Sequence, residues 1–154
     1  WLIASEFFAI KKNKVSNDFF LEHALVHGNF YGTSKDFVET KIAEGINIIL
    51  EIDVQGVQQI KSTNFPHESI FLLPPSIESL TERLNERGTN SKESIELRLS
   101  NAMKEIPSCK DYDHILVNDV FEDCCNDLAR IITGEDSFPM NSKKELFLTK
   151  LLNS

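Results

Sequence analysis

The sequence is poor in the residues that mark fibrous, disordered or disulfide-stapled chains. Its 154 residues include 6 Gly, 5 Pro and 3 Cys, and 41% are hydrophobic. So little glycine and proline excludes a collagen-like repeat, and this apolar share excludes a disordered chain. The cysteines are odd in number, Cys124 and Cys125 are adjacent, and no C-x-x-C pair occurs. We therefore expect free thiols in a reducing compartment, and neither a disulfide framework nor a zinc site.

Long hydrophobic runs and an excess of positive charge are also missing. No run approaches the roughly 18 apolar residues of a membrane span, and no basic segment precedes Trp1. We expect no membrane partner, no signal peptide and a cytoplasmic location. The 16 Lys and Arg against 24 Asp and Glu give a net charge of −8, which disfavours a nucleic acid polymer as a partner. The oligomeric state stays open, and a homodimer is among the states allowed.

Apolar patterning predicts an α/β fold. Residues 1–34 read as a small mixed unit, with a helix at 5–13, a polar loop at 14–18, a strand at 19–26 and a turn at Gly28-Asn29. Buried strands are expected at 47–53, 69–73 and 114–117, and helices at 34–44, 76–86, 92–106 and 120–132. This alternation predicts a parallel sheet between helical layers. The tail, 134–154, is expected to hold a loop and a short amphipathic helix.

Three arginines flank a polar stretch at 88–91. Arg83 and Arg87 lie four apart on a predicted helix, and Arg98 follows eleven residues after Arg87. Fork-shaped guanidinium groups on both sides of a flexible polar loop suit the binding of phosphate oxygens. The alternative is a solvated helix face with ion pairs to neighbouring glutamates, and the spacing alone favours this alternative.

Carboxylates and hydroxyls gather at two other places. Glu51 and Asp53 share one side of the predicted strand 47–53, at its carboxyl end, where ligands bind in doubly wound sheets. Asp53 can equally cap the following helix, and the two roles are compatible. Glu22, Tyr31 and Thr33 could form a small polar pocket. The four histidines show no spacing typical of a metal site or a catalytic triad, so no metal-binding residue is expected.

Five segments together resemble the guanylate kinase family, a group of P-loop nucleoside monophosphate kinases. They are FLEHALVHGNFYGTSK at 20–35, ILEIDVQGVQQI at 49–60, LLPPS at 72–76, ERLNERGTNS at 82–91 and ILVND at 115–119. They occur in the family's order and near its spacing over about the first 130 residues. The ordered set is much more specific than any one motif. The last twenty residues lie beyond it and inherit nothing from the resemblance.

The resemblance implies a fold and a reaction. The fold is a three-layer, parallel-sheet P-loop kinase core, incomplete here, with a small mixed α+β GMP-binding subdomain and a helical lid. Residues 1–34 would be the C-terminal part of that subdomain, 35–86 and 100–133 the core, 87–99 the lid and 134–154 an extension. The reaction transfers the γ-phosphoryl group of ATP to GMP, giving ADP and GDP, with magnesium.

The resemblance also implies which residues bind GMP. Glu22 matches the carboxylate that accepts from the guanine N1–H and amino group together. Thr33 matches the hydroxyl that faces the guanine O6, and Asp53 the second carboxylate near the amino group. Tyr31 matches a phenol that contacts the GMP phosphate.

On the ATP side, the resemblance implies a set of cations. Arg83, Arg87 and Arg98 match catalytic arginines that close over the phosphates, and Arg83 and Asn118 match positions that bind ATP. The P-loop pattern G-x-x-x-x-G-K-[ST] would lie upstream in the family and does not occur in these 154 residues, so we expect no turnover from residues 1–154 alone. The alternative function is that of guanylate-kinase-like scaffold domains, which hold phosphopeptides. The arginines and Glu22 favour the enzyme.

Overall fold

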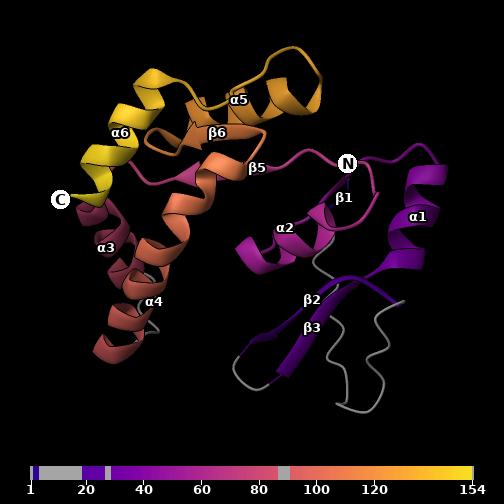
Figure 1. The fold of residues 1–154 in the computed structure, drawn as a ribbon, viewed down its shortest axis with the longest axis horizontal. Coiled ribbons are helices and arrows are strands. Elements are labelled where there is room, and N and C mark those ends of the chain that lie inside the picture. The colour runs from indigo at the N-terminus through magenta and orange to yellow at the C-terminus, as the bar shows by residue number, and fades with distance from the viewer. Residues whose placement is uncertain (1, 4–18, 27–28, 87–90, 154) are drawn as a thin grey trace. The chain divides into compact units, whose positions relative to one another are not determined.

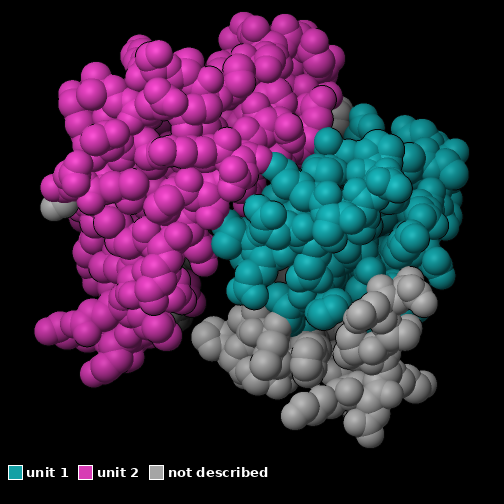
Figure 2. Space-filling view, in the orientation of Figure 1, with its two compact units in different colours: residues 1–67 teal, residues 68–154 magenta. Residues whose placement is uncertain are grey.

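We analysed a computed structural model of the chain, which describes residues 2–3, 19–26, 29–86 and 91–153 (Figure 1). The chain divides into two compact units, residues 1–67 and 68–154, coloured separately in Figure 2. The expected helix at 5–13, the loop at 14–18 and Gly28 of the expected turn lie outside the described residues, as does Arg87. No helix among the described residues is long and apolar enough to span a bilayer.

Unit 1 combines a β-hairpin with two helices. Its elements are β1 (Leu2–Ile3), β2 (Phe20–Val26), β3 (Asn29–Ser34), α1 (Lys35–Ala43), β4 (Ile48–Ile49) and α2 (Val54–Lys61). Strands β2 and β3 pair antiparallel, and β1 and β4 pair parallel. Its core joins β2, α1 and α2 through three buried side chains, Leu21, Val38 and Ile60.

Caps explain where the helices of unit 1 begin and end. The Ser34 hydroxyl accepts from the Phe37 N–H at 3.3 Å and starts α1. Gly45, with φ +78°, lies just past the end of α1, where the left-handed conformation favours glycine. The Asp53 carboxylate accepts from the Gly56 N–H at 2.9 Å and starts α2. These caps satisfy backbone groups that a helix leaves unpaired at its ends.

Unit 2 alternates strands and helices around a larger apolar core. Its elements are β5 (Ile70–Leu73), α3 (Ile77–Glu86), α4 (Lys92–Glu105), the 3₁₀ helix η1 (Ile106–Asp111), β6 (His114–Val117), α5 (Phe121–Ile132) and α6 (Ser142–Leu152). Strands β5 and β6 are parallel, in register from Ile70 opposite His114 to Leu73 opposite Val117. Leu148 and Leu151 of α6 bury against Leu73 and Ile115, so the predicted tail helix forms and packs on unit 2.

The α/β class and the parallel strand pairing are confirmed, and the four helices predicted after residue 34 begin and end within one residue of the expected positions. The strand expected at 47–53 is shorter: only Ile48 and Ile49 pair, with β1, so the described ladder stops there. The described strands form three two-stranded sheets where one sheet was expected. The division into subdomain, core and lid stays a prediction.

Candidate functional site

A β-bulge in the hairpin of unit 1 determines where Glu22 lies. Phe20 pairs with Ser34, whereas Glu22 pairs with Thr33, so Leu21 is one extra residue on β2. A bulge of this kind re-aims the residues beside it. Leu21 enters the apolar core of unit 1, and Glu22 lies directly opposite Thr33.

Glu22 is a buried carboxylate that accepts a hydrogen bond from Thr33. Glu22 is only 6% exposed, and the Thr33 hydroxyl donates to its Oε1 at 2.5 Å. An ionised carboxylate offers about four acceptor positions on its two oxygens. Because Thr33 uses one of them, Glu22 keeps capacity to accept further N–H donors from a ligand.

The first turn of α2 brings Asp53 to the same place. Asp53 Oδ1 accepts the Gly56 N–H, and its second oxygen, Oδ2, is not used by this cap. A β-carbon built on Gly56 would lie 3.1 Å from Glu22 Oε2, so the Gly56 backbone is in close contact with the Glu22 carboxylate. Helix α2 contacts β2 along this side (Figure 1). Asp53 is therefore brought to the pair that Glu22 and Thr33 form, whereas Glu51 is exposed.

Tyr31 lies on β3, two residues before Thr33 and opposite Ala24. Side chains two apart on a strand share a face and are separated by roughly 7 Å. Between them lies Gly32, where a β-carbon would come within 2.8 Å of Phe20 Cδ1 and 2.9 Å of the Glu22 carbonyl oxygen. Only glycine fits this close approach of the two strands. The hairpin thus aligns Tyr31 with Thr33 on one surface.

Two residues expected on the ATP side are joined in unit 2. Arg83, on α3, donates from Nη1 to the Asn118 carbonyl oxygen at 2.9 Å and from Nη2 to the Asp119 carbonyl oxygen at 3.4 Å. The Asn118 N–H in turn donates to the Leu73 carbonyl oxygen at 2.8 Å. The forked guanidinium is therefore tied to the end of β6, and its remaining N–H donors can serve a ligand.

The other two arginines are less constrained. Arg98 is exposed on α4, which lies beside α3 in unit 2 (Figure 1), and Arg87 lies outside the described residues. Among the described residues, neither Arg83 nor Arg98 forms an ion pair. The interpretation of these arginines as an ion-paired helix face is therefore not supported for the two that are described.

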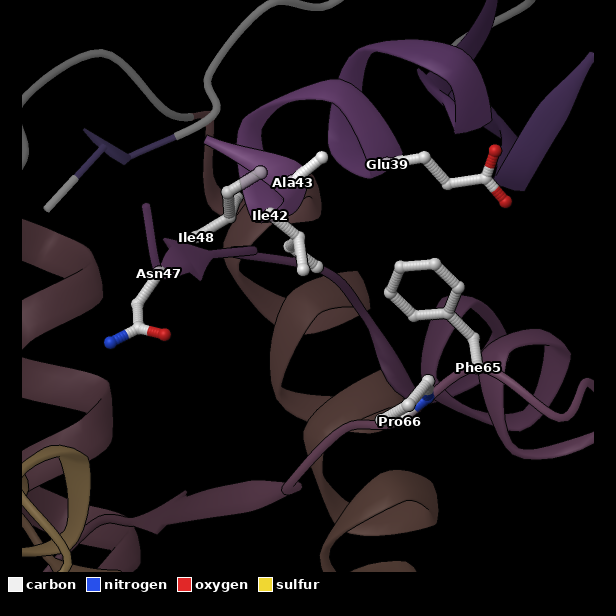
Figure 3. A pocket seen from close by; sticks show the side chains of 7 residues that line it. All are labelled: Glu39, Ile42, Ala43, Asn47, Ile48, Phe65 and Pro66. Atoms are coloured by element: carbon white, nitrogen blue, oxygen red, sulfur yellow. The ribbon is translucent and has the colours of Figure 1, made fainter. Parts of the chain in front are cut away.

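A separate hollow on unit 1 contains none of the predicted site residues. It measures about 510 Å³ and lies between the end of α1, β4 and the segment after α2 (Figure 3). Its lining is mainly apolar and includes Ile42, Ile48 and Phe65. Within the described part of the chain, no three His, Cys, Asp or Glu side chains converge as a metal site.

Sequence reasoning missed two features that shape this site. The extra residue at Leu21 leaves no mark in the local pattern, because apolar Leu21 beside polar Glu22 is compatible with an ordinary strand. Gly56 could have been noticed, since a glycine in the first turn of a helix often marks a close approach of another group.

Comparisons with known proteins agree on one family. The sequence profile of the family described as "Guanylate kinase" matches residues 5–135. The chain is 47% identical over 116 residues to a guanylate kinase of Hahella chejuensis, a match that covers 75% of this chain and 56% of that protein. It is 41% identical over 140 residues to a guanylate kinase of Buchnera aphidicola, covering 90% of this chain and 68% of that protein. The matches thus span between 56% and 68% of the length of these two relatives.

A solved structure is similar as well. The crystal structure of guanylate kinase from Anaplasma phagocytophilum matches with a TM-score of 0.62 at 27% sequence identity. The match covers 94% of this chain and 81% of that one.

Proposed function

Because this chain belongs to the guanylate kinase family, we propose that the complete protein is an ATP:GMP phosphotransferase. A phosphate oxygen of GMP bonds to the γ-phosphorus of ATP while the bond from that phosphorus to the β–γ bridging oxygen breaks, giving GDP and ADP. No general base is needed, since the GMP phosphate is already an anion. The single observation that carries the proposal is the buried Glu22 carboxylate held by Thr33.

Glu22 supplies base recognition. Guanine presents two adjacent donors, N1–H and the amino group, and a carboxylate can accept from both. Adenine has an acceptor at N1, which would face the Glu22 oxygens without a proton between them. A buried polar group left unpaired by the wrong substrate is a strong filter against it.

Thr33 acts as a donor that changes partners. Its single hydroxyl hydrogen is donated to Glu22 Oε1 in the structure. When guanine arrives, its N–H groups replace that hydrogen on Glu22, and the Thr33 hydroxyl is released to donate to the guanine O6. Asp53 Oδ2 accepts from the amino group, and Tyr31, on the same face of β3, binds the phosphate.

ATP and the transferring phosphoryl group are bound by residues of the second set, Arg83, Arg87, Arg98 and Asn118. Phosphoryl transfer depends on positioning and on neutralising the charge of the phosphate oxygens. The fixed fork of Arg83 suits that role, and Arg98 has an exposed position from which it can approach phosphates. Magnesium, which the family resemblance implies, would enter bound to the ATP phosphates. The cytoplasmic location predicted from the sequence is consistent with three cysteines that are all free thiols.

The test is an assay of ADP release by the protein in its complete natural length, with GMP, AMP, CMP and UMP offered separately. We expect turnover with GMP only, and a loss of kcat/KM of about a hundredfold or more in Glu22→Gln, because the amide places a donor against the guanine N–H groups. Glu39→Gln is the matched control, since Glu39 is half-exposed on α1 in a loose ion pair at 3.8 Å and should keep full activity. Absence of turnover with all four nucleotides would contradict the proposal.

A further inference from the structure

Both ends of the Gln59 side-chain amide bind the main chain of His23, and Nε2 also makes a longer hydrogen bond of 3.4 Å to the Gln55 carbonyl oxygen within α2. The His23 N–H donates to Gln59 Oε1 at 3.0 Å, and Gln59 Nε2 donates to the His23 carbonyl oxygen at 2.8 Å. The partners fix which amide atom is oxygen and which is nitrogen, because a backbone N–H must face an acceptor and a carbonyl must face a donor.

This pair of hydrogen bonds lies on the side of β2 that pairs with no strand among the described residues. Along a strand, the N–H and carbonyl groups of one residue point to the same side, so those of His23 point to Gln59 and away from β3. The Gln59 amide therefore pairs with His23 as the N–H and carbonyl groups of one opposite residue of a neighbouring antiparallel strand would. It satisfies the backbone N–H and carbonyl of His23 on this side of β2, where the described part of the chain supplies no strand partner.

The contact between Gln59 and His23 also constrains the backbone next to Glu22 in the candidate site. The His23 nitrogen belongs to the peptide group that directly follows the Glu22 Cα, so Gln59 holds the backbone plane beside Glu22. Gln59 lies three residues after Gly56 on α2 and therefore on the same face, the face that approaches the Glu22 carboxylate. The same helix begins at Asp53.

We propose that Gln59 is a positioning residue for base recognition, which sets the distance between the carboxylates of Glu22 and Asp53. The inference rests on the proposed function, in which these two carboxylates accept from the guanine amino group. Gln59 itself does not touch the nucleotide. It acts by joining β2, which carries Glu22, to α2, whose N-cap is Asp53.

The experiment compares GMP with IMP, which has the N1–H but lacks the amino group at position 2. Gln59→Met removes both hydrogen bonds at similar side-chain volume, and Gln59→Glu keeps the acceptor for the His23 N–H but loses the donor to its carbonyl. Gln58→Met is the matched control, because Gln58 is the same residue type and is exposed at the preceding position of α2. The measured quantity is the ratio of kcat/KM for GMP to kcat/KM for IMP, with ATP saturating.

We expect this ratio to fall about tenfold in Gln59→Met and by a smaller factor in Gln59→Glu, with the KM for ATP unchanged and Gln58→Met like the wild type. The ratio does not depend on how much of each preparation is folded, so a loss of stability alone would leave it unchanged. Equal losses for GMP and IMP in an active enzyme would overturn the role of Gln59 while leaving the proposed function intact. A wild-type protein without GMP-dependent turnover would instead overturn both. If Gln59→Met yields no folded protein, the ratio in Gln59→Glu decides.

Discussion

Adding one methyl group at Gly56 should weaken GMP binding without weakening the fold. In Gly56→Ala, the new β-carbon would lie 3.1 Å from Glu22 Oε2 and 3.1 Å from Ile52 Cβ. Ordinary contact begins near 3.4 Å, so each neighbour must retreat by about 0.3 Å. The carboxylate has little freedom to do so, because its other oxygen is already 2.5 Å from the Thr33 hydroxyl.

The effects on binding and on stability have opposite signs. A displaced Glu22 no longer meets both guanine donors well, and a loss of about 1.4 kcal/mol in these charge-assisted hydrogen bonds corresponds to a tenfold rise in KM for GMP. Alanine is a better helix former than glycine by up to about 1 kcal/mol, which offsets the strain in α2. We therefore expect a higher KM for GMP with a melting temperature equal to or above that of the wild type.

Gly45→Ala provides the reverse control. Nothing lies within 4 Å of a β-carbon built there, but its φ of +78° is unfavourable for alanine. That variant should lose about 1 kcal/mol of stability and keep its KM for GMP. Steady-state kinetics with varied GMP and thermal unfolding of both variants provide the readout. An unchanged KM in Gly56→Ala would refute the reasoning, since the Gly56 backbone would then not limit where Glu22 lies.

Two further perturbations address unit 2. Arg83→Lys replaces the guanidinium fork that binds the Asn118 and Asp119 carbonyls with a single ammonium group, so kcat/KM for ATP should fall by about tenfold to a hundredfold. Arg130→Lys is the control, because Arg130 lies in a surface ion-pair cluster and its replacement should leave kcat/KM unchanged. Equal activity of the two variants would argue against a role for Arg83. Burial raises the pKa of the Cys109 thiol above its ordinary value of 9.0, so the unfolded chain loses this proton first and the free energy of unfolding falls as pH rises above 9.0. The free energy of unfolding can be measured with urea at pH 7.5 and at about pH 10. Above pH 9.0 the wild type should lose up to about 1.4 kcal/mol of it per pH unit relative to Cys109→Ala. A difference in free energy between the two proteins that is the same at both pH values would contradict this.

Local signals in the sequence predicted the helices well and the sheets poorly. Ser34 and Asp53 are cap residues whose preference is local, and Gly45 ends α1 for a conformational reason that needs no tertiary contact. Strand pairing depends on distant partners: residues 47–53 read as one strand, yet within the described residues only Ile48 and Ile49 have a ladder partner. A pattern of apolar residues shows that a segment can pair, and it does not show with what.

The same distinction applies to the site. Glu22, Thr33 and Asp53 were identifiable as polar residues beside strands and caps, and the family resemblance suggested a role for each. Their mutual placement depends on the one-residue shift at Leu21, which no local pattern predicts. The amide of Gln59 was equally hidden, because its partner lies 36 positions earlier in the chain.

The extra residue in β2 gives the hairpin an unequal tolerance to sequence change. Leu21 needs only to be apolar and of similar size, so many replacements at that position would preserve the ladder on either side. A change in length has a different effect, because Leu21 is the residue by which β2 exceeds β3 between the pairs Phe20–Ser34 and Glu22–Thr33. Deleting Leu21 would leave the carboxylate opposite Thr33 in a regular ladder, but it would remove the side chain that β2 contributes to the core with Val38 and Ile60. The extra residue therefore lets two neighbouring positions of one strand serve different purposes, Leu21 the core of unit 1 and Glu22 the candidate site.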